Sequence, residues 1–364
     1  MLGNERRLPA VFGAIHASVD AACAMAVLSA VVLHRLAPWH AFYLVVGYNV
    51  LAFAGQAPLG AATDKLRAPR GAALLGLLLT VAATLALPVE PVATMIFAGV
   101  GNALFHVGAG AITLRLNPER ATAPGIFVAP GALGLALGVW LGRGGWSLTW
   151  PFTVALAVGF VVTALITVPP GTYRAAERRA DRDERPPAVP WPKLVVGLLL
   201  LSVAVRSLLG FAGAYAVPKE PVVLFALATA AFGGKALGGI VSDRLGWIET
   251  SVGALLLSAP LLAWGGTNAA VVVVGMFLFQ MTMPVTLSAI GLVHPDRPGF
   301  AFGVACLALI LGALPTFTAT VRSYYGWAPF LVLVLVSATS VYAGLRLLGS
   351  RNPVRGWLSR RGAR

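Results

Sequence analysis

Apolar segments long enough to cross a lipid bilayer recur along almost the whole chain. A spanning helix requires about 20 largely apolar residues, and in hydrocarbon only helices and closed barrels satisfy their own backbone polar groups. The sequence therefore predicts an all-α integral membrane protein with twelve transmembrane helices. They lie at roughly 9–33, 38–62, 70–88, 91–114, 121–142, 147–168, 192–216, 221–242, 248–265, 269–291, 299–320 and 326–347.

The composition agrees with a chain that is dissolved in lipid. Hydrophobic residues make up 58% and charged residues 11% of the chain, whereas a soluble domain carries about 25% charged residues. The net charge is +14. The charged residues lie in the loops between the apolar segments and are not interleaved with aromatic residues, so nucleic-acid binding is not expected. Cys23 and Cys306 fall inside apolar segments, where we expect small buried side chains.

The basic residues predict the orientation of the chain. With the N-terminus inside, 21 Lys and Arg residues are cytoplasmic, four are external and two lie within segments. Such an asymmetry is the positive-inside pattern. It predicts a multi-pass protein of the plasma membrane with both termini in the cytoplasm.

A polar stretch at 171–190 divides six predicted helices from six. The sequence thus predicts an N-terminal six-helix bundle at 1–170, a cytoplasmic linker at 171–190 and a C-terminal six-helix bundle at 191–350. The basic tail at 351–364 is expected to lie against anionic lipid headgroups. The pattern Gly-x-x-x-Asp-[Lys/Arg]-Leu follows both the second and the eighth segment, at Asp64 and Asp243. This repeat predicts two pseudo-symmetric halves.

Polar residues occur near the middle of the first, fourth, seventh and tenth segments. Most are spaced i,i+4 and so share a helix face. Polar groups at mid-membrane depth are costly and mark binding sites or pathways, which predicts a transporter. The residues are His16 and Asp20, Asn102 and His106, Ser202 and Arg206, and Gln280 with Thr282 and Thr286.

The repeated loop motif resembles the signature G-x-x-x-D-R-x-G-R-[RK] of the major facilitator superfamily. The second copy matches at Gly239, Asp243, Arg244 and Gly246, and the first copy retains Gly60 and Asp64. The resemblance implies that the motif aspartate pairs with basic residues and a neighbouring helix N-terminus across a cytoplasmic gate. Asp64, Asp243 and Arg244 are therefore predicted gating residues; the alternative is ordinary loop charges.

The fifth segment resembles the G-x-x-x-G-P-x-x-G-G motif of the superfamily's antiporters. It reads PGIFVAPGALGLALG from Pro124 to Gly138, with Ala129 in place of a glycine. Its glycines permit close helix approach, and Pro130 allows a bend, so Pro130 is a predicted gating residue. The motif favours exchange, although Gly- and Pro-rich membrane helices also occur without it.

Three short features resemble the fosmidomycin-resistance-type efflux branch of the superfamily. They are His16-x-x-x-Asp20, Phe105-His106 in a glycine-rich helix, and a single Arg206 in the seventh helix. The resemblance implies export of a small solute.

Asp20 is the only carboxylate that we place in the membrane interior, and it is the predicted proton carrier together with His16. The predicted substrate-binding residues are His106, Arg206, Asn102 and Gln280. The alternatives are a structural pair of Asp20 with Arg206 or His16, and interhelical hydrogen bonds for the two amides.

The leading hypothesis is proton-coupled export of a small organic anion or zwitterion by alternating access, with uptake close behind. A carrier of copper(I) or zinc using Met281, Met283, Cys23 and Met25 together with histidine is less favoured. Met281 and Met283 are spaced i,i+2 and so point to different helix faces. A non-transporting receptor or scaffold is the remaining alternative. ATP-binding, hydrolase-triad and metalloprotease motifs are absent, so we expect no enzyme, cofactor or metal. The expected partners are the solute, protons and lipids, and nothing demands more than a monomer.

Overall fold

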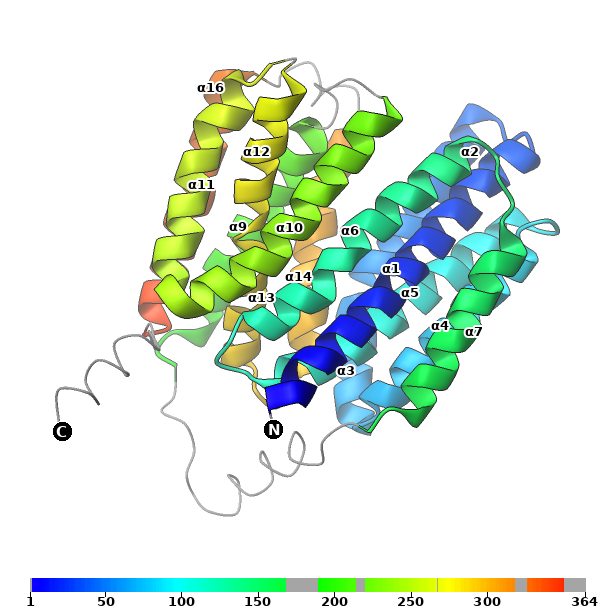
Figure 1. Ribbon diagram of the computed structural model, residues 1–364, viewed down its shortest axis with the longest axis horizontal. Coiled ribbons are helices and arrows are strands. Elements are labelled where there is room, and N and C mark those ends of the chain that lie inside the picture. The colour runs from blue at the N-terminus through cyan, green and yellow to red at the C-terminus, as the bar shows by residue number, and fades with distance from the viewer. Residues whose placement is uncertain (1, 168–188, 214–219, 267, 318–325, 350–364) are drawn as a thin grey trace. The chain divides into compact units, whose positions relative to one another are not determined.

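The helices of the chain are shown in Figure 1. The computed structural model describes residues 2–167, 189–213, 220–266, 268–317 and 326–349. Every regular element among these residues is helical, which confirms the all-α prediction. The predicted linker is almost wholly outside the described residues, and the predicted basic tail is entirely so.

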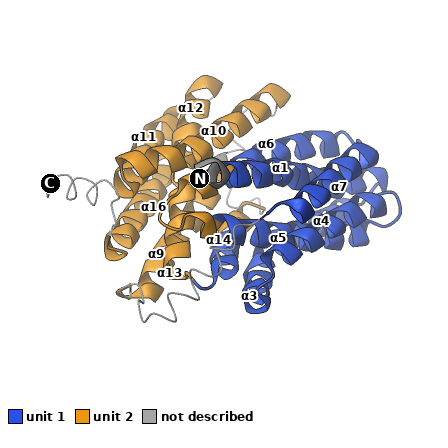
Figure 2. Cartoon of the chain, turned by 60° about the horizontal axis from the view of Figure 1, so that its bottom comes forward, with its two compact units in different colours: residues 1–113, 127–169, 296–307 blue, residues 114–126, 170–295, 308–364 orange. Residues whose placement is uncertain are grey.

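Two compact units divide the chain, and Figure 2 colours them separately. Unit 1 comprises residues 1–113, 127–169 and 296–307, and unit 2 comprises residues 114–126, 170–295 and 308–364. Each unit thus includes a short segment from the opposite half of the sequence. The domain boundaries that the sequence suggests stay a prediction.

Unit 1 is built mainly from the N-terminal half of the chain. It also receives the C-terminal part of α6, from Phe127 onward, and the first turns of α14. Its elements are α1 (Leu2–Leu33), α2 (Pro38–Asn49), the π-helical η1 (Val50–Ala54), α3 (Gln56–Leu66), α4 (Pro69–Ala86), α5 (Pro91–Leu116), α6 (Thr122–Arg143), α7 (Thr149–Leu165) and α14 (Pro298–Ala313).

Unit 2 contains the remaining helices, the last turn of α5, the start of α6 and the end of α14. Its own elements are α9 (Pro192–Gly213), α10 (Pro221–Leu245), α11 (Trp247–Trp264), α12 (Ala269–Gln280), α13 (Met283–Val293), the 3-10 helix η2 (Leu314–Phe317) and α16 (Trp327–Leu347).

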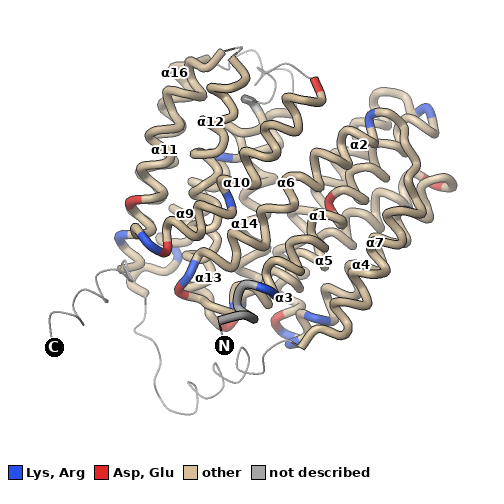
Figure 3. Tube along the Cα trace, in the orientation of Figure 1, with Lys and Arg blue, Asp and Glu red and all other residues tan. Residues whose placement is uncertain are grey.

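The helices match the twelve predicted segments. Among the described residues, eleven helical spans are long and apolar enough to cross a membrane, and α7, with 17 residues, is a shorter apolar helix. Large apolar side chains remain exposed on the outer helices, such as Val154, Val158 and Val161 on α7. Figure 3 shows the charged residues of the described part mainly near helix ends. This distribution is that of a multi-pass membrane protein.

Three segments that the sequence predicted as single helices are irregular. The second passes through a π-helical turn between α2 and α3, the tenth breaks between α12 and α13, and the eleventh ends in a 3-10 turn. In the tenth segment the cause is Pro284, the second residue of α13, whose nitrogen has no hydrogen to donate to the Gln280 carbonyl. The sequence periodicity did not reveal these breaks because all three segments remain apolar throughout.

Helices α1 and α6 approach closely along a row of glycines. A Cβ atom on Gly134 would lie 2.7 Å from the backbone carbonyl carbon and Cα of Ala17, and one on Gly138 would lie 2.9 Å from the Cα of Ala21. Both distances are shorter than side-chain contacts permit. The glycines of the fifth predicted segment therefore set the spacing that brings the two helices together.

Replacing Gly134 by Ala should destabilise the protein, because the added methyl group meets backbone that cannot move aside. We expect a loss of about 1–3 kcal/mol, seen as a lower thermal unfolding midpoint in detergent. The matched control is Gly253→Ala on α11, where a Cβ would find nothing within 4 Å and helix propensity favours alanine by about 1 kcal/mol. Equal midpoints for the two variants would contradict the close approach.

Candidate functional site

Four polar side chains of unit 1 meet between α1 and α5. His16 and Asp20 lie one turn apart on α1, with His16 Nε2 3.0 Å from Asp20 Oδ2. From α5, the Asn102 amide donates to Asp20 Oδ1 at 2.9 Å, and His106 Nε2 lies 3.7 Å from the same oxygen. The structure thus brings together the polar pairs of the first and fourth predicted segments.

The other nitrogen of each imidazole faces a backbone carbonyl. His16 Nδ1 lies 3.0 Å from the Phe127 oxygen on α6, and His106 Nδ1 lies 2.8 Å from the Asn102 oxygen. A carbonyl oxygen can only accept a hydrogen bond, so each Nδ1 carries a hydrogen and donates it. In a neutral imidazole the remaining nitrogen, Nε2, is then an acceptor.

The two Nε2 atoms nevertheless lie only 2.8 Å apart, with the rings nearly perpendicular at 85°. Two acceptors at this distance repel unless a cation lies between them. The neighbouring Asp20 carboxylate adds a third acceptor, and its negative charge balances one bound proton. The cluster His16–Asp20–His106 is therefore built to hold a positive charge, of which a shared proton is the simplest form.

Gly131 of α6 lies directly against this cluster, where a larger residue does not fit. A Cβ on Gly131 would lie 2.6 Å from His16 Cε1 and 2.8 Å from Asp20 Oδ2, and it would also collide with His16 Nε2. The Asp20 side chain is 16% exposed, about twice as much as either imidazole. Asp20 is thus the member of the cluster that is most open to exchange with its surroundings.

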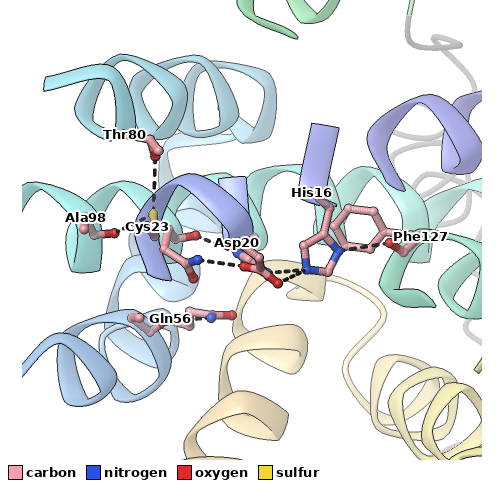
Figure 4. A network of polar contacts seen from close by, with 10 residues as sticks. His16, Asp20, Cys23, Gln56, Thr80, Ala98 and Phe127 are labelled. Carbon is pink, nitrogen blue, oxygen red and sulfur yellow. Dashed lines mark hydrogen bonds and ion pairs between the residues drawn. The ribbon is translucent and has the colours of Figure 1, made fainter. Parts of the chain in front are cut away.

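Figure 4 shows the polar contacts of His16 and Asp20, and aromatic side chains lie beside the cluster. Phe105 and Phe127 are fully buried. Cys23, one turn beyond Asp20, points to the Ala98 carbonyl at 3.5 Å and to Thr80. Cys23 therefore packs α1 against α4 and α5, as a small buried side chain would.

In unit 2, the guanidinium of Arg206 is buried with few partners. The side chain of Arg206 on α9 is 6% exposed overall and donates from one terminal nitrogen to Thr286 of α13 at 2.9 Å. Its Nε is buried without a hydrogen-bond partner among the described residues. A buried charge left in this state is costly, so the site favours an anion that supplies the missing acceptor.

The other polar residues predicted in the seventh and tenth segments contact neighbouring residues of the protein. Gln280 is half-buried and its amide lies 3.6 Å from the Met276 sulfur. Ser202, which the sequence pairs with Arg206, instead exchanges a 2.7 Å hydrogen bond with Ser337 on α16. Ser202 thus joins α9 to α16, whereas Arg206 turns to α13.

The two repeat aspartates cap helix N-termini in the same manner. In unit 1, Asp64 accepts from the backbone amides of Gly299 at 3.0 Å and Phe300 at 2.8 Å, in the first turn of α14. In unit 2, Asp243 accepts from the amides of Ala121 at 2.8 Å and Thr122 at 2.9 Å at the start of α6. The carboxylates satisfy amides that the helix itself leaves unpaired.

Asp243 makes two further contacts. It accepts from the Thr122 hydroxyl at 2.5 Å and from the Trp247 indole at 3.2 Å. Arg244 is exposed, and the partners of Asp243 in the described part of the chain are the donors named above. Pro130 lies within α6, one turn beyond the Ile126 carbonyl whose hydrogen bond it removes and close to the Phe127 carbonyl that binds His16.

Sequence reasoning missed the groups that complete these sites. The Phe127 carbonyl gave no signal, because a backbone atom carries none. Gly131 was recognised as a small residue of a helix contact, but not as the neighbour of His16 and Asp20. The first-turn amides of α14 and α6 were expected only in general terms, through the family resemblance.

These features together define a multi-helix membrane protein of the secondary-transporter class. The model of the Major Facilitator Superfamily matches residues 10–313, and the chain belongs to this superfamily. None of the curated proteins compared matches the sequence. The family prediction and the two-bundle fold are thereby confirmed, and the fold is that of a transporter and not of an enzyme.

Solved structures with the same fold cover nearly the whole chain. The chain is similar to the fucose:proton symporter FucP of E. coli, with a TM-score of 0.67 and 13% identity over 94% of this chain and 98% of that one. The human organic anion transporter MFSD10 has a TM-score of 0.67 and 17% identity, over 95% of this chain and 99% of that one. The proton:xylose symporter XylE has a TM-score of 0.63 and 13% identity, over 93% of this chain and 94% of that one.

Substitution of the capping aspartates should impair transport more than binding. In Asp243→Asn, an amide nitrogen replaces one carboxylate oxygen and faces the donors at the start of α6, which removes the charge and one acceptor. We expect solute flux in liposomes to fall several-fold while stabilisation of the purified protein by the solute persists. Glu249→Gln, an exposed acid on α11, is the control. If Asp243→Asn were no longer stabilised by the solute, a gating role would be contradicted.

Proposed function

We propose that the protein is a proton-coupled exporter that exchanges protons for a small organic anion or zwitterion by alternating access. The observation that carries the proposal is the convergence of three acceptors, His16 Nε2, His106 Nε2 and an Asp20 oxygen, without a donor among them. Such a cluster has a place for one proton. The cluster lies within spanning helices. Binding a proton on one side of the membrane and releasing it on the other would therefore couple transport to the proton gradient.

Arg206 supports an anionic group on the solute. Its guanidinium keeps its charge at physiological pH, and its buried Nε has no acceptor within the described residues. Carboxylate, phosphonate and phosphate oxygens fit the planar fork of this side chain. Gln280 ends α12 at the break before α13, in the same predicted span as Thr286, and is the second polar residue that we propose for solute binding there.

In this proposal, the capping contacts of Asp64 and Asp243 open and close during the transport cycle. Each contact joins a repeat aspartate to a helix from the other half of the sequence, and each consists of hydrogen bonds that can break and re-form without covalent change. We therefore assign to both the role of gate latches, with Pro130 as a bending point in α6.

Export is favoured by the antiporter-like glycine motif and by the resemblance to the fosmidomycin-resistance-type branch. The alternative is proton-coupled uptake, for which the same residues would serve, and the fold itself is also that of the fucose:proton symporter. The excess of basic residues on one side of the predicted topology supports a plasma-membrane location with both termini in the cytoplasm.

The Asp20→Asn variant tests the proton carrier. Asparagine preserves size and hydrogen bonding but cannot cycle a charge, so it should abolish solute movement driven by a pH gradient and leave downhill exchange of the solute measurable. The assay is flux in proteoliposomes, with a solute found by stabilisation screening of organic anions. Asp296→Asn, an exposed aspartate, is the matched control. Retention of full proton-driven flux by Asp20→Asn would reject this assignment.

The Arg206→Lys variant tests the anion site. An ammonium group cannot reproduce the fork of the guanidinium, and a lost charged hydrogen bond costs about 1.5–3 kcal/mol. We expect the affinity for an anionic solute to fall roughly 10- to 100-fold while the response to the pH gradient persists. The comparison is equilibrium binding by Arg206→Lys and by Arg297→Lys, an exposed arginine. Equal affinities in both would exclude Arg206 from the binding site.

A further inference from the structure

The three acceptors of the His16–Asp20–His106 cluster also fit a metal cation. We infer that His16, Asp20 and His106 form a binding site for a divalent transition metal of the Zn²⁺ class, with the two imidazole Nε2 atoms and the Asp20 carboxylate as ligands. The three ligand atoms all lie within 4.8 Å of one another. This inference goes beyond the proposed transport reaction and does not depend on it.

The distances between the ligand atoms are close to those of a tetrahedral site. A zinc ion with bonds of about 2.0–2.1 Å holds its ligand atoms about 3.4 Å apart. The separations are 2.8 Å between the two Nε2 atoms, 3.0 Å from His16 to Asp20 and 3.7 Å from His106 to Asp20. Small side-chain movements therefore bring all three to bonding distance of one ion.

The hydrogen bonds behind the ligands are those that metal sites use. A metal-bound histidine commonly donates its second N–H to a carbonyl or carboxylate, which fixes the tautomer and the ring orientation. Here His16 donates to Phe127 and His106 donates to the Asn102 backbone, so both Nε2 lone pairs are directed at the shared position. The Asn102 side chain holds Asp20 in the same way.

Helix α6 lies directly against two of the three ligands. Gly131 is the residue there, and a Cβ would come within 2.8 Å of Asp20 Oδ2 and collide with His16 Nε2. Two histidines and one carboxylate suit zinc and related ions better than calcium or magnesium. The soft residue Cys23 faces the Ala98 carbonyl and Thr80 instead and takes no part.

The sequence did not predict this site because its histidines lie 90 residues apart. Only His16 and Asp20 are near neighbours along the chain, and an i,i+4 pair of this kind is common on membrane helices. The fold supplies the third ligand.

Metal binding by the purified full-length protein tests the inference. After chelation, Co²⁺ is titrated as a probe, because its visible absorption reports a four- or five-coordinate site, and Zn²⁺ is added to displace it. We expect one ion per chain and a higher thermal unfolding midpoint with Zn²⁺. His106→Gln and Asp20→Asn should each lower the affinity at least tenfold. Gly131→Ala should do the same while removing no ligand.

The remaining histidines of the chain provide the control. The chain has five histidines, and a variant with His34→Gln, His40→Gln and His294→Gln keeps only those of the cluster. It should retain one Co²⁺ per chain with the spectrum unchanged. Loss of binding in this variant, absence of a Co²⁺ spectrum in the wild type, or equal affinities in wild type and His106→Gln would each overturn the inference. Since none of these measurements involves flux, failure of the proposed transport reaction would be seen separately.

Discussion

Water is absent from the hydrocarbon core of a membrane, so every polar group that enters it must find a partner within the protein. This constraint explains why each described element is a helix and why Thr80 and Thr113 return their hydroxyls to the carbonyl four residues earlier. It also makes exceptions informative. The buried Nε of Arg206 has no partner in the described part of the chain, and the Nε2 atoms of His16 and His106 face each other. A further ion or ligand would stabilise both arrangements.

Gly131 connects the packing of the helices to the chemistry of the site. The glycines of α6 allow α1 to approach, and this approach places the Phe127 carbonyl against His16 Nδ1. The carbonyl fixes the tautomer, and the tautomer turns the Nε2 lone pair toward His106. A larger residue at 131 would disturb both the helix contact and the cluster. The same glycine-rich segment thus has a structural role and a chemical one.

The two halves of the sequence share a helix-capping aspartate but differ in the charged residues in the middle of their helices. Both use the repeat aspartate to cap a helix start with two backbone hydrogen bonds, at α14 for Asp64 and at α6 for Asp243. Their mid-helix charges differ, since α1 carries a carboxylate beside imidazoles and α9 carries a guanidinium. This division is the physical basis for our proposal that one unit binds the proton and the other binds the anion.

The sequence by itself determined the number and approximate positions of the apolar helical segments, because hydrophobic length is a local property. It also pointed to Asp20, His16, His106 and Arg206, because polar residues in apolar segments are rare and costly. Only the tertiary structure decided which of these residues meet. It joined Asn102 to Asp20, turned Ser202 away to Ser337, and brought Thr286 to Arg206. It also supplied the Phe127 carbonyl and the close approach at Gly131. These depend on helix rotation and approach, which long-range packing sets and which no local pattern encodes.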